Sequence, residues 1–134
     1  MAVVTGAGTG IGRETALALG RKGCRLALCD IDVEPLEALR EELESTGTTV
    51  STLRVDVSSR QEMEEFAASV VDRYGSAQIL INNAGVTVYA TFEEHSLEDL
   101  EGILGVNLWG ILHGCKFFLP HLKAAGEGHI VNLS

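Results

Sequence analysis

The chain begins with a short apolar run that passes directly into a glycine-rich turn, and this pairing restricts its fold more than any other feature. Residues 2–5 (AVVT) have strand character, and glycines at positions 6, 8, 10 and 12 follow as a helical pattern begins at Ile11. Glycine permits positive φ, lets backbone approach a ligand without an intervening Cβ, and lets a helix pack closely on a strand. Such a turn places the free N–H groups of the helix start beside its occupant. The natural occupant is a phosphate or pyrophosphate group.

Further apolar runs recur along the chain, and each is separated from the next by a helical pattern. They span residues 25–30, 49–56, 78–82 and 129–133. Strands that are joined by helices form a parallel sheet with right-handed crossovers and helices on both faces. Burial on both faces also explains why these runs are uniformly apolar. We therefore expect a Rossmann-like doubly wound α/β domain, with about five parallel strands, over residues 1–134.

Local signals mark where two of the intervening helices begin. Ser58 with Gln61, and Ser96 with Asp99, have the spacing of capping boxes. The second pair opens a long helix that Pro120 should end or kink, because proline lacks the N–H that a helix interior needs. This helix carries an apolar stripe that we expect to face the core: Leu100, Ile103, Leu104, Leu108, Ile111, Leu112 and Cys115.

Asp30 ends the second apolar run, 20 residues after Gly10, and gives the turn a chemical partner. A carboxylate there can accept hydrogen bonds from both ribose hydroxyls of an adenosine and would repel a 2′-phosphate, which favours NAD over NADP. Arg13 and Arg25 are nearby bases in the sequence that would soften this preference. An ATP-type phosphate loop fits poorly, because Gly12 is followed by Arg13 and not by lysine. An S-adenosylmethionine site also uses a glycine turn and a following acid, and the motif alone leaves that alternative open.

The charge and hydropathy of the chain exclude several classes of partner. The formal net charge is −9, so nucleic acid and anionic membranes would be repelled over most of the surface. No apolar run approaches the ~18 residues of a membrane-spanning helix. There is no charged-then-apolar leader, so we expect a cytoplasmic protein.

Cysteine and histidine give no indication of a metal site. The three cysteines include no CxxC pair and are expected to be small buried side chains. The four histidines show no metal-ligand spacing, and the sequence assigns none of them a chemical role; His113 and His121 are expected on a helix flank.

Six short motifs occur in order along the whole chain, and together they are specific. They are TGAGTGIG (5–12), CD (29–30), VDV (55–57), NNAG (82–85), VNLWG (106–110) and GHIVNLS (128–134). In this combination the chain resembles the classical short-chain dehydrogenase/reductase family.

The resemblance implies a role for individual residues. Those beside the pyrophosphate would be Gly6, Thr9, Gly10 and Ile11. Those on the adenosine half would be Asp30 at the ribose and Ile31, Asp56 and Val57 at the adenine, with the Asp56 carboxylate on the exocyclic amine. Those beside the ribose nearer the nicotinamide would be Asn83, Ala84 and Gly85. Asn107 matches the asparagine that supports a proton relay through a bound water, although a polar group satisfied by backbone is an equally good interpretation.

The same resemblance implies catalytic groups that these residues lack. The family uses a serine and a Tyr-x-x-x-Lys pair, in which lysine lowers the pKa of the tyrosine. Neither Tyr74 nor Tyr89 has a lysine four residues on, and Ser134 comes one residue before the usual catalytic serine. We therefore expect an incomplete dinucleotide-binding domain, without the C-terminal part of the family fold.

Two functions follow from these observations. The first is the NAD(P)-binding portion of a dehydrogenase that, when complete, transfers hydride between nicotinamide and a secondary alcohol or ketone, a small-molecule substrate. The alternative is a non-catalytic dinucleotide-binding or self-associating fragment. The long helix carries Trp109, Phe117 and Phe118, and the equivalent helix in the family helps to build a dimer interface. We accordingly expect a homo-oligomer.

Overall fold

A computed structural model describes residues 1–133, so Ser134, the last residue of the GHIVNLS motif, lies outside the described residues. Five strands form one parallel sheet in the order β3-β2-β1-β4-β5. Their bounds are β1 Ala2–Thr5, β2 Leu26–Asp30, β3 Val50–Arg54, β4 Ile79–Asn82 and β5 His129–Asn132. This confirms the doubly wound α/β fold expected from the alternation of apolar runs and helical patterns.

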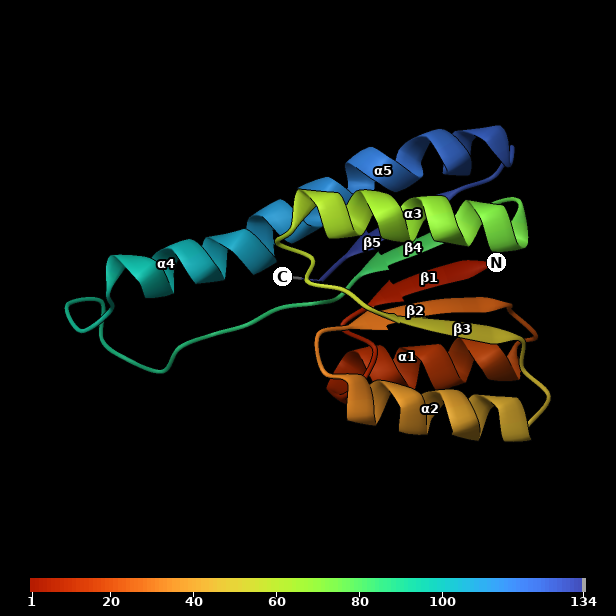
Figure 1. The fold of residues 1–134 in the computed structure, drawn as a ribbon, viewed down its shortest axis with the longest axis horizontal. Coiled ribbons are helices and arrows are strands. Elements are labelled where there is room, and N and C mark those ends of the chain that lie inside the picture. The colour runs from red at the N-terminus through yellow and green to blue at the C-terminus, as the bar shows by residue number, and fades with distance from the viewer. Residues whose placement is uncertain (134) are drawn as a thin grey trace.

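The helices cover both faces of the sheet (Figure 1). The helices have the bounds α1 Gly10–Arg21, α2 Val33–Ser45, α3 Arg60–Tyr74, α4 Leu97–Leu104, η1 Gly105–Gly110 and α5 Ile111–Ala124. Helices α1 and α2 lie on one face, and α3 and α5 on the other. Successive residues of β1 accordingly enter different clusters: Val3 packs with Phe66 and Phe118, whereas Ala2 and Val4 pack on the α1 and α2 side. Both faces of the sheet are thus buried, as predicted from strands in which apolar and polar residues do not alternate.

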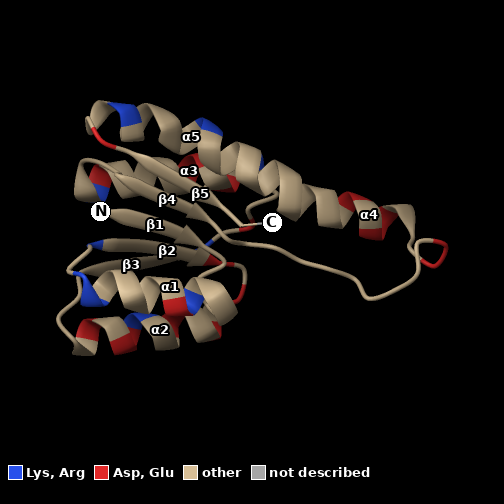
Figure 2. Ribbon diagram, turned by 180° about the vertical axis from the view of Figure 1, so that it is seen from behind, with Lys and Arg blue, Asp and Glu red and all other residues tan. Residues whose placement is uncertain are grey.

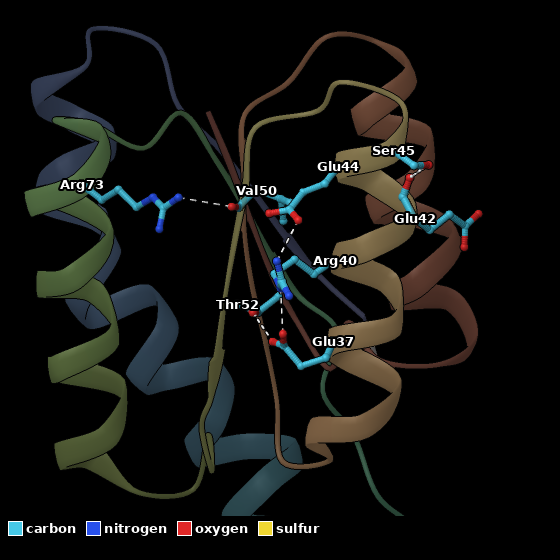
Figure 3. A network of polar contacts seen from close by, with 8 residues as sticks. All are labelled: Glu37, Arg40, Glu42, Glu44, Ser45, Val50, Thr52 and Arg73. Atoms are coloured by element: carbon cyan, nitrogen blue, oxygen red, sulfur yellow. Dashed lines mark hydrogen bonds and ion pairs between the residues drawn. The ribbon is translucent and has the colours of Figure 1, made fainter.

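A polar network holds α2 against the edge strand β3 (Figure 3). The Thr52 hydroxyl donates to the carboxylate of Glu37, whose other oxygen accepts from Arg40 Nε at 2.7 Å. Arg40 also donates to Glu44, one turn further on, at 2.7 Å. Because of the Thr52 bond first and the Arg40 bond second, the pKa of Glu37 lies below its ordinary value.

One of the predicted helix boundaries is wrong, and one alternative at a second is excluded. The cap of α3 is Ser59 and not Ser58: the N–H of Glu62 donates to Ser59 Oγ at 3.3 Å. Ser58 instead donates its N–H and its hydroxyl to Asp56, which closes the preceding turn. Of the end or kink predicted at Pro120, the end is excluded, because α5 continues to Ala124. The Ser96–Asp99 capping box is present as predicted, with both reciprocal hydrogen bonds formed.

The segment from α4 through η1 to α5 forms one long helix whose first half projects away from the sheet (Figure 1). Contrary to expectation, no residue of its apolar stripe is buried: Leu104, Leu108 and Leu112 are 53%, 48% and 45% exposed, and the other four are half-buried. No Lys, Arg, Asp or Glu occurs from residue 102 to 115, as the uncoloured middle of the helix in Figure 2 shows. By length and composition alone, the helix Leu97–Ala124 could cross a membrane, because it contains an 18-residue stretch with a mean hydropathy of 1.3. The expectation that no stretch approaches that length was therefore wrong, although the core helix of a water-soluble protein passes the same test.

Candidate functional site

A cavity of about 380 Å³ opens where the carboxyl ends of the strands meet. Parallel sheets bind ligands at this edge, beside the point where the strand order reverses, which here lies between β1 and β4. All eleven residues that the sequence suggested for a coenzyme line this one cavity: Gly6, Thr9, Gly10, Ile11, Asp30, Ile31, Asp56, Val57, Asn83, Ala84 and Gly85. These eleven residues come from four of the motifs or lie beside them, and Val106, which also lines the cavity, adds the fifth motif, VNLWG.

The glycine turn forms the floor of the cavity, and its backbone leaves little room for side chains. Gly6 and Gly10 have positive φ, +62° and +53°, which L residues adopt at a cost. A Cβ on Gly12 would lie 2.0 Å from the carbonyl oxygen of Gly6, so α1 can approach the turn only through glycine. Thr9 is the N-cap of α1, but its side chain makes no capping hydrogen bond. The first N–H groups of α1 are therefore available to an anion.

Asn83, which follows β4, braces the glycine turn. Its Nδ2 donates to the carbonyl oxygens of Thr5 and Gly6 at 3.0 and 2.9 Å. The Thr5 hydroxyl in turn accepts the N–H groups of Asn83 and Ala84 at 3.0 and 3.1 Å. The side chain of Asn83 thus ties neighbouring strands together, and a coenzyme at this position would meet its backbone and that of Ala84.

Asp30 lies at the tip of β2 and turns toward the glycine turn. Its Oδ2 accepts the N–H of Gly8 at 2.8 Å, and its Oδ1 accepts the N–H of Asp32 at 3.1 Å. Each carboxylate oxygen keeps a lone pair for a further donor. Neither of the bases expected near Asp30 lines the cavity. Arg13 pairs with Glu14 and Glu42, and the guanidinium of Arg25, before the amino end of β2, lies 5.5 Å from the ring centre of Tyr74.

The opposite wall of the cavity is the turn that follows β3. Asp56 Oδ1 accepts the N–H and the hydroxyl of Ser58 at 2.9 and 2.7 Å, which fixes the carboxylate. The N–H of Asp56 donates to Glu62 at 2.8 Å, and Glu62 also pairs with Arg54 at 3.0 Å. Glu62 therefore positions the backbone of this wall from the first turn of α3.

Asn107 lies in η1, outside the lining of the cavity. Its side-chain amide makes two hydrogen bonds with the backbone of Val86: Nδ2 donates to the carbonyl oxygen at 2.9 Å, and Oδ1 accepts the N–H at 2.8 Å. This pairing holds the NNAG segment against the long helix. The interpretation as a satisfied polar group describes the side chain well, and the proton relay stays a prediction.

The sequence missed four lining residues: Asp32, Val55, Val86 and Val106. Val55 and Val106 already lie inside the motifs VDV and VNLWG, and extending the motifs CD and NNAG by two residues would have found Asp32 and Val86. Cys29, beside Asp30, is fully buried, and burial with the neighbouring carboxylate raises the pKa of its thiol, which stays protonated. The described polar residues that line the cavity are Asp30, Asp32 and Asp56, with Thr9 and Asn83.

Comparison with known proteins identifies the family. The model of the short chain dehydrogenases matches residues 1–134. The chain belongs to the short-chain dehydrogenase family. It is 40% identical over its whole length to SadH of Mycobacterium tuberculosis, which is named as an oxidoreductase, and 33% identical over 132 residues to the 3-oxoacyl-[acyl-carrier-protein] reductase FabG of Thermotoga maritima. It spans 49% of the first relative and 54% of the second, so this short-chain dehydrogenase sequence covers about half the length of the curated relatives that it matches.

Solved structures of the family share the fold closely. A short-chain dehydrogenase/reductase from Burkholderia phymatum, in complex with NAD, superposes with a TM-score of 0.93 at 35% identity over 96% of this chain and 46% of its own. A metagenomic short-chain oxidoreductase in complex with NADP gives 0.94 at 34% identity over 100% of this chain and 60% of its own. Nicotinamide dinucleotides are the coenzymes of this family, and both forms occur among its structures. The S-adenosylmethionine alternative therefore falls away.

Proposed function

We propose that residues 1–134 form the coenzyme-binding domain of an NAD-dependent short-chain dehydrogenase. The observation that carries the proposal is the convergence of residues from five motifs on one cavity at the strand-order reversal. The adenosine half would lie between Asp30 and Asp56, and the pyrophosphate would lie at the start of α1. The ribose nearer the nicotinamide would lie beside Asn83, Ala84 and Gly85.

The donors and the shape of the cavity fit such a coenzyme. The start of α1 offers backbone N–H groups that the Thr9 side chain does not cap, and these suit a pyrophosphate. Nothing lies within 4 Å of a Cβ built on Gly10, so the cavity is open at the position where the pyrophosphate would approach. Ile11 and Ile31 are 65% and 52% exposed at the mouth, where apolar side chains can cover the coenzyme.

The carboxylates of the cavity favour NAD over NADP. Asp30 is held by two backbone N–H groups, and Asp32 lies in the same lining. A 2′-phosphate placed against Asp30 would bring its negative charge beside two carboxylates, with no arginine in the lining to balance it among the described residues.

When it is bound, the coenzyme supplies a nicotinamide that accepts or donates a hydride, here to or from a secondary alcohol or ketone. The protein's own part is to bind and orient. Asn107 holds the segment after Gly85 in place through Val86, and we assign to this asparagine the support of a proton relay in the complete enzyme. The serine, tyrosine and lysine that complete this chemistry would come from outside residues 1–134, and the substrate would be a small molecule.

The wider setting is also part of the proposal. The uncharged, exposed face of the long helix suits a homo-oligomer, and the net charge of −9 disfavours nucleic acid and anionic membranes. We place the protein in the cytoplasm.

Isothermal titration with NAD, NADP and S-adenosylmethionine tests the central claim. NAD should bind more tightly than NADP by at least about tenfold, since Asp30 opposes a 2′-phosphate, and S-adenosylmethionine should not bind. Failure of both dinucleotides to bind the folded protein would refute the proposal. Residues 1–134 lack the serine and the Tyr-x-x-x-Lys pair, so turnover of secondary alcohols is assayed with a longer protein that carries these groups. Binding without turnover in that protein would support the non-catalytic alternative.

A further inference from the structure

His113 contacts the wall of the cavity from outside it. Its Nδ1 lies 3.0 Å from the carbonyl oxygen of Val57, a residue 56 positions earlier in the chain. Val57 lines the cavity and is 6% exposed. A carbonyl oxygen can only accept, so Nδ1 must carry the proton and His113 must be the donor. A buried carbonyl needs such a partner, because leaving it unpaired costs free energy.

The ring of His113 is held on both sides along the helix. Trp109 and Phe117, one turn before and one turn after it, have ring centres 5.9 and 6.4 Å from that of His113. Such aromatic contacts limit the movement of the ring. Phe117 packs against the core cluster that contains Val57, so the ring is fixed relative to the wall that it contacts.

The helix approaches the wall closely enough for this contact to act on it. A Cβ on Gly110, one turn before His113, would lie 2.7 Å from Val57 Cγ2. The backbone of the long helix therefore rests on Val57, and the imidazole fixes the carbonyl next to that contact. Glu62 holds the N–H of the preceding residue, Asp56, from α3. The wall is thus held at the Val55–Asp56 peptide from α3 and at the Val57–Ser58 peptide from α5.

We propose that His113 is a positioning residue for the adenine side of the coenzyme cavity, which it orders by donating Nδ1–H to the Val57 carbonyl. This inference rests on the proposed function, because it takes the cavity to bind the adenosine half of a dinucleotide. It gives a role to a histidine that shows no metal spacing and no acidic partner in the sequence.

Matched variants separate positioning from mere packing. His113→Phe keeps the aromatic stack and removes the donor. His113→Asn keeps a donor, because the amide Nδ2 stands at the same distance along the side chain as the imidazole Nδ1. His121→Phe is the control, since it makes the same change two turns further on, in the groove between α3 and α5 and away from the cavity.

Isothermal titration of these variants should use NAD and ADP-ribose, which lacks the nicotinamide. His113→Phe should weaken both by about 3- to 10-fold, the effect of one lost hydrogen bond. The loss of affinity should be equal for NAD and ADP-ribose, because His113 acts on the adenosine half, which both molecules contain. His113→Asn should recover part of the affinity, and His121→Phe should change it by less than about twofold. A variant His113→Phe with a lower melting temperature and unchanged affinity would overturn the inference, as would equal losses in the control.

Nitrogen NMR on ¹⁵N-histidine-labelled wild-type protein provides a test that needs no folded variant at position 113. The neutral imidazole of His113 should be the Nδ1–H tautomer, and its signals should shift when ADP-ribose is added. An Nε2–H tautomer would overturn the inference while leaving the proposed function intact. If the wild-type protein binds neither probe, the proposed function fails and this inference fails with it.

Discussion

At the scale of single residues, the cavity depends on backbone positions that leave no room for a side chain. Gly12 is the tightest of these, because a Cβ there would lie 2.0 Å from the Gly6 carbonyl oxygen, a backbone atom that cannot move aside cheaply. Gly12→Ala should lower the free energy of unfolding by about 1–3 kcal/mol, as overpacking does, and abolish dinucleotide binding. Urea unfolding measures the first effect and calorimetric titration the second.

A matched glycine provides the control for this prediction. Gly102 lies inside α4, and nothing described comes within 4 Å of a Cβ there. Gly102→Ala should therefore leave binding unchanged and raise helix stability slightly, because alanine is the better helix former. Equal destabilisation by the two changes would show that steric closeness at Gly12 is not the cause.

Asp30 supports a second residue-scale prediction, about the choice of coenzyme. Asp30→Ala removes the carboxylate that opposes a 2′-phosphate and leaves the Gly8 N–H without its partner. NAD affinity should fall about tenfold, while NADP affinity should rise or stay the same, so that the preference narrows or reverses. Fluorescence titration of both coenzymes measures the ratio. If the ratio of NAD to NADP affinity is unchanged in the variant, Asp30 does not determine the choice of coenzyme. The repulsion of a 2′-phosphate would then come from Asp32 and Asp56.

The residues of the site differ in how far the sequence could predict them. Gly10 and Asp30 were predictable because each belongs to a local sequence pattern. One pattern is a glycine turn after a strand, the other is an acidic residue at the end of the next strand, and both are typical of dinucleotide binding. Glu62 and His113 were not, because each acts on a backbone atom of another element. No spacing rule links position 113 to position 57. Likewise, Ser58 and Ser59 are adjacent candidates for one cap, and only the backbone path of the turn decides between them.

At the scale of elements, the packing of α2 on β3 has a pH dependence that can be worked out. The pKa of Glu37 in the folded protein lies below its ordinary 4.5, chiefly because the Thr52 hydroxyl donates to it. Its contribution to stability is therefore complete above pH 4.5 and is lost as the pH falls through the lower folded-state pKa. Because the side chain of Glu37 is 41% exposed, solvent screening keeps this contribution below about 1 kcal/mol.

Thr52→Val tests this account, since it removes the hydroxyl and keeps the shape of the side chain. The variant should be less stable than the wild type at pH 7, and the difference should shrink as the pH is lowered past 4.5. Urea unfolding at several pH values gives the comparison. Thr49→Val makes the same chemical change at an exposed position just before β3 and should show no such dependence. A difference that is constant with pH would mean that Thr52 acts without Glu37.

The long helix shows where element prediction from sequence fails. Its start was predictable, because the Ser96–Asp99 capping box is a local signal. Its continuation to Ala124 was not predictable. Proline lacks the N–H for one helical hydrogen bond, and the packing of α5 against β4 and α3 offsets the cost of that missing bond. The π-helical turn at Gly105–Gly110 was also invisible in the sequence. It coincides with the Asn107 contact to Val86 and the close approach of Gly110 to Val57, which are tertiary constraints.

At the scale of the whole molecule, the fold followed from the sequence because a parallel sheet with right-handed crossovers leaves few arrangements for alternating strands and helices. The placement of the long helix did not follow. Its apolar stripe has the spacing of a core-facing helix, yet half of Leu108 and more than half of Leu104 remain exposed. A stripe of apolar residues predicts that one face of a helix is buried, but it does not identify the surface that buries it.

We expect a second copy of the protein to cover this face, and a charge placed in it tests the expectation. Leu104, Leu108 and Leu112 follow one another at four-residue spacing and are 53%, 48% and 45% exposed, so they share one side of the helix. Leu112→Glu would bury an unpaired carboxylate in a dimer, which should raise the dimer dissociation constant at least about tenfold. Ala18→Glu adds the same charge to an exposed position of α1, on the other face of the sheet, and should leave association unchanged. Sedimentation velocity over a range of concentrations measures all three proteins. A wild type that stays monomeric throughout, or a Leu112→Glu variant that dimerises as the wild type does, would show that a different surface covers the stripe.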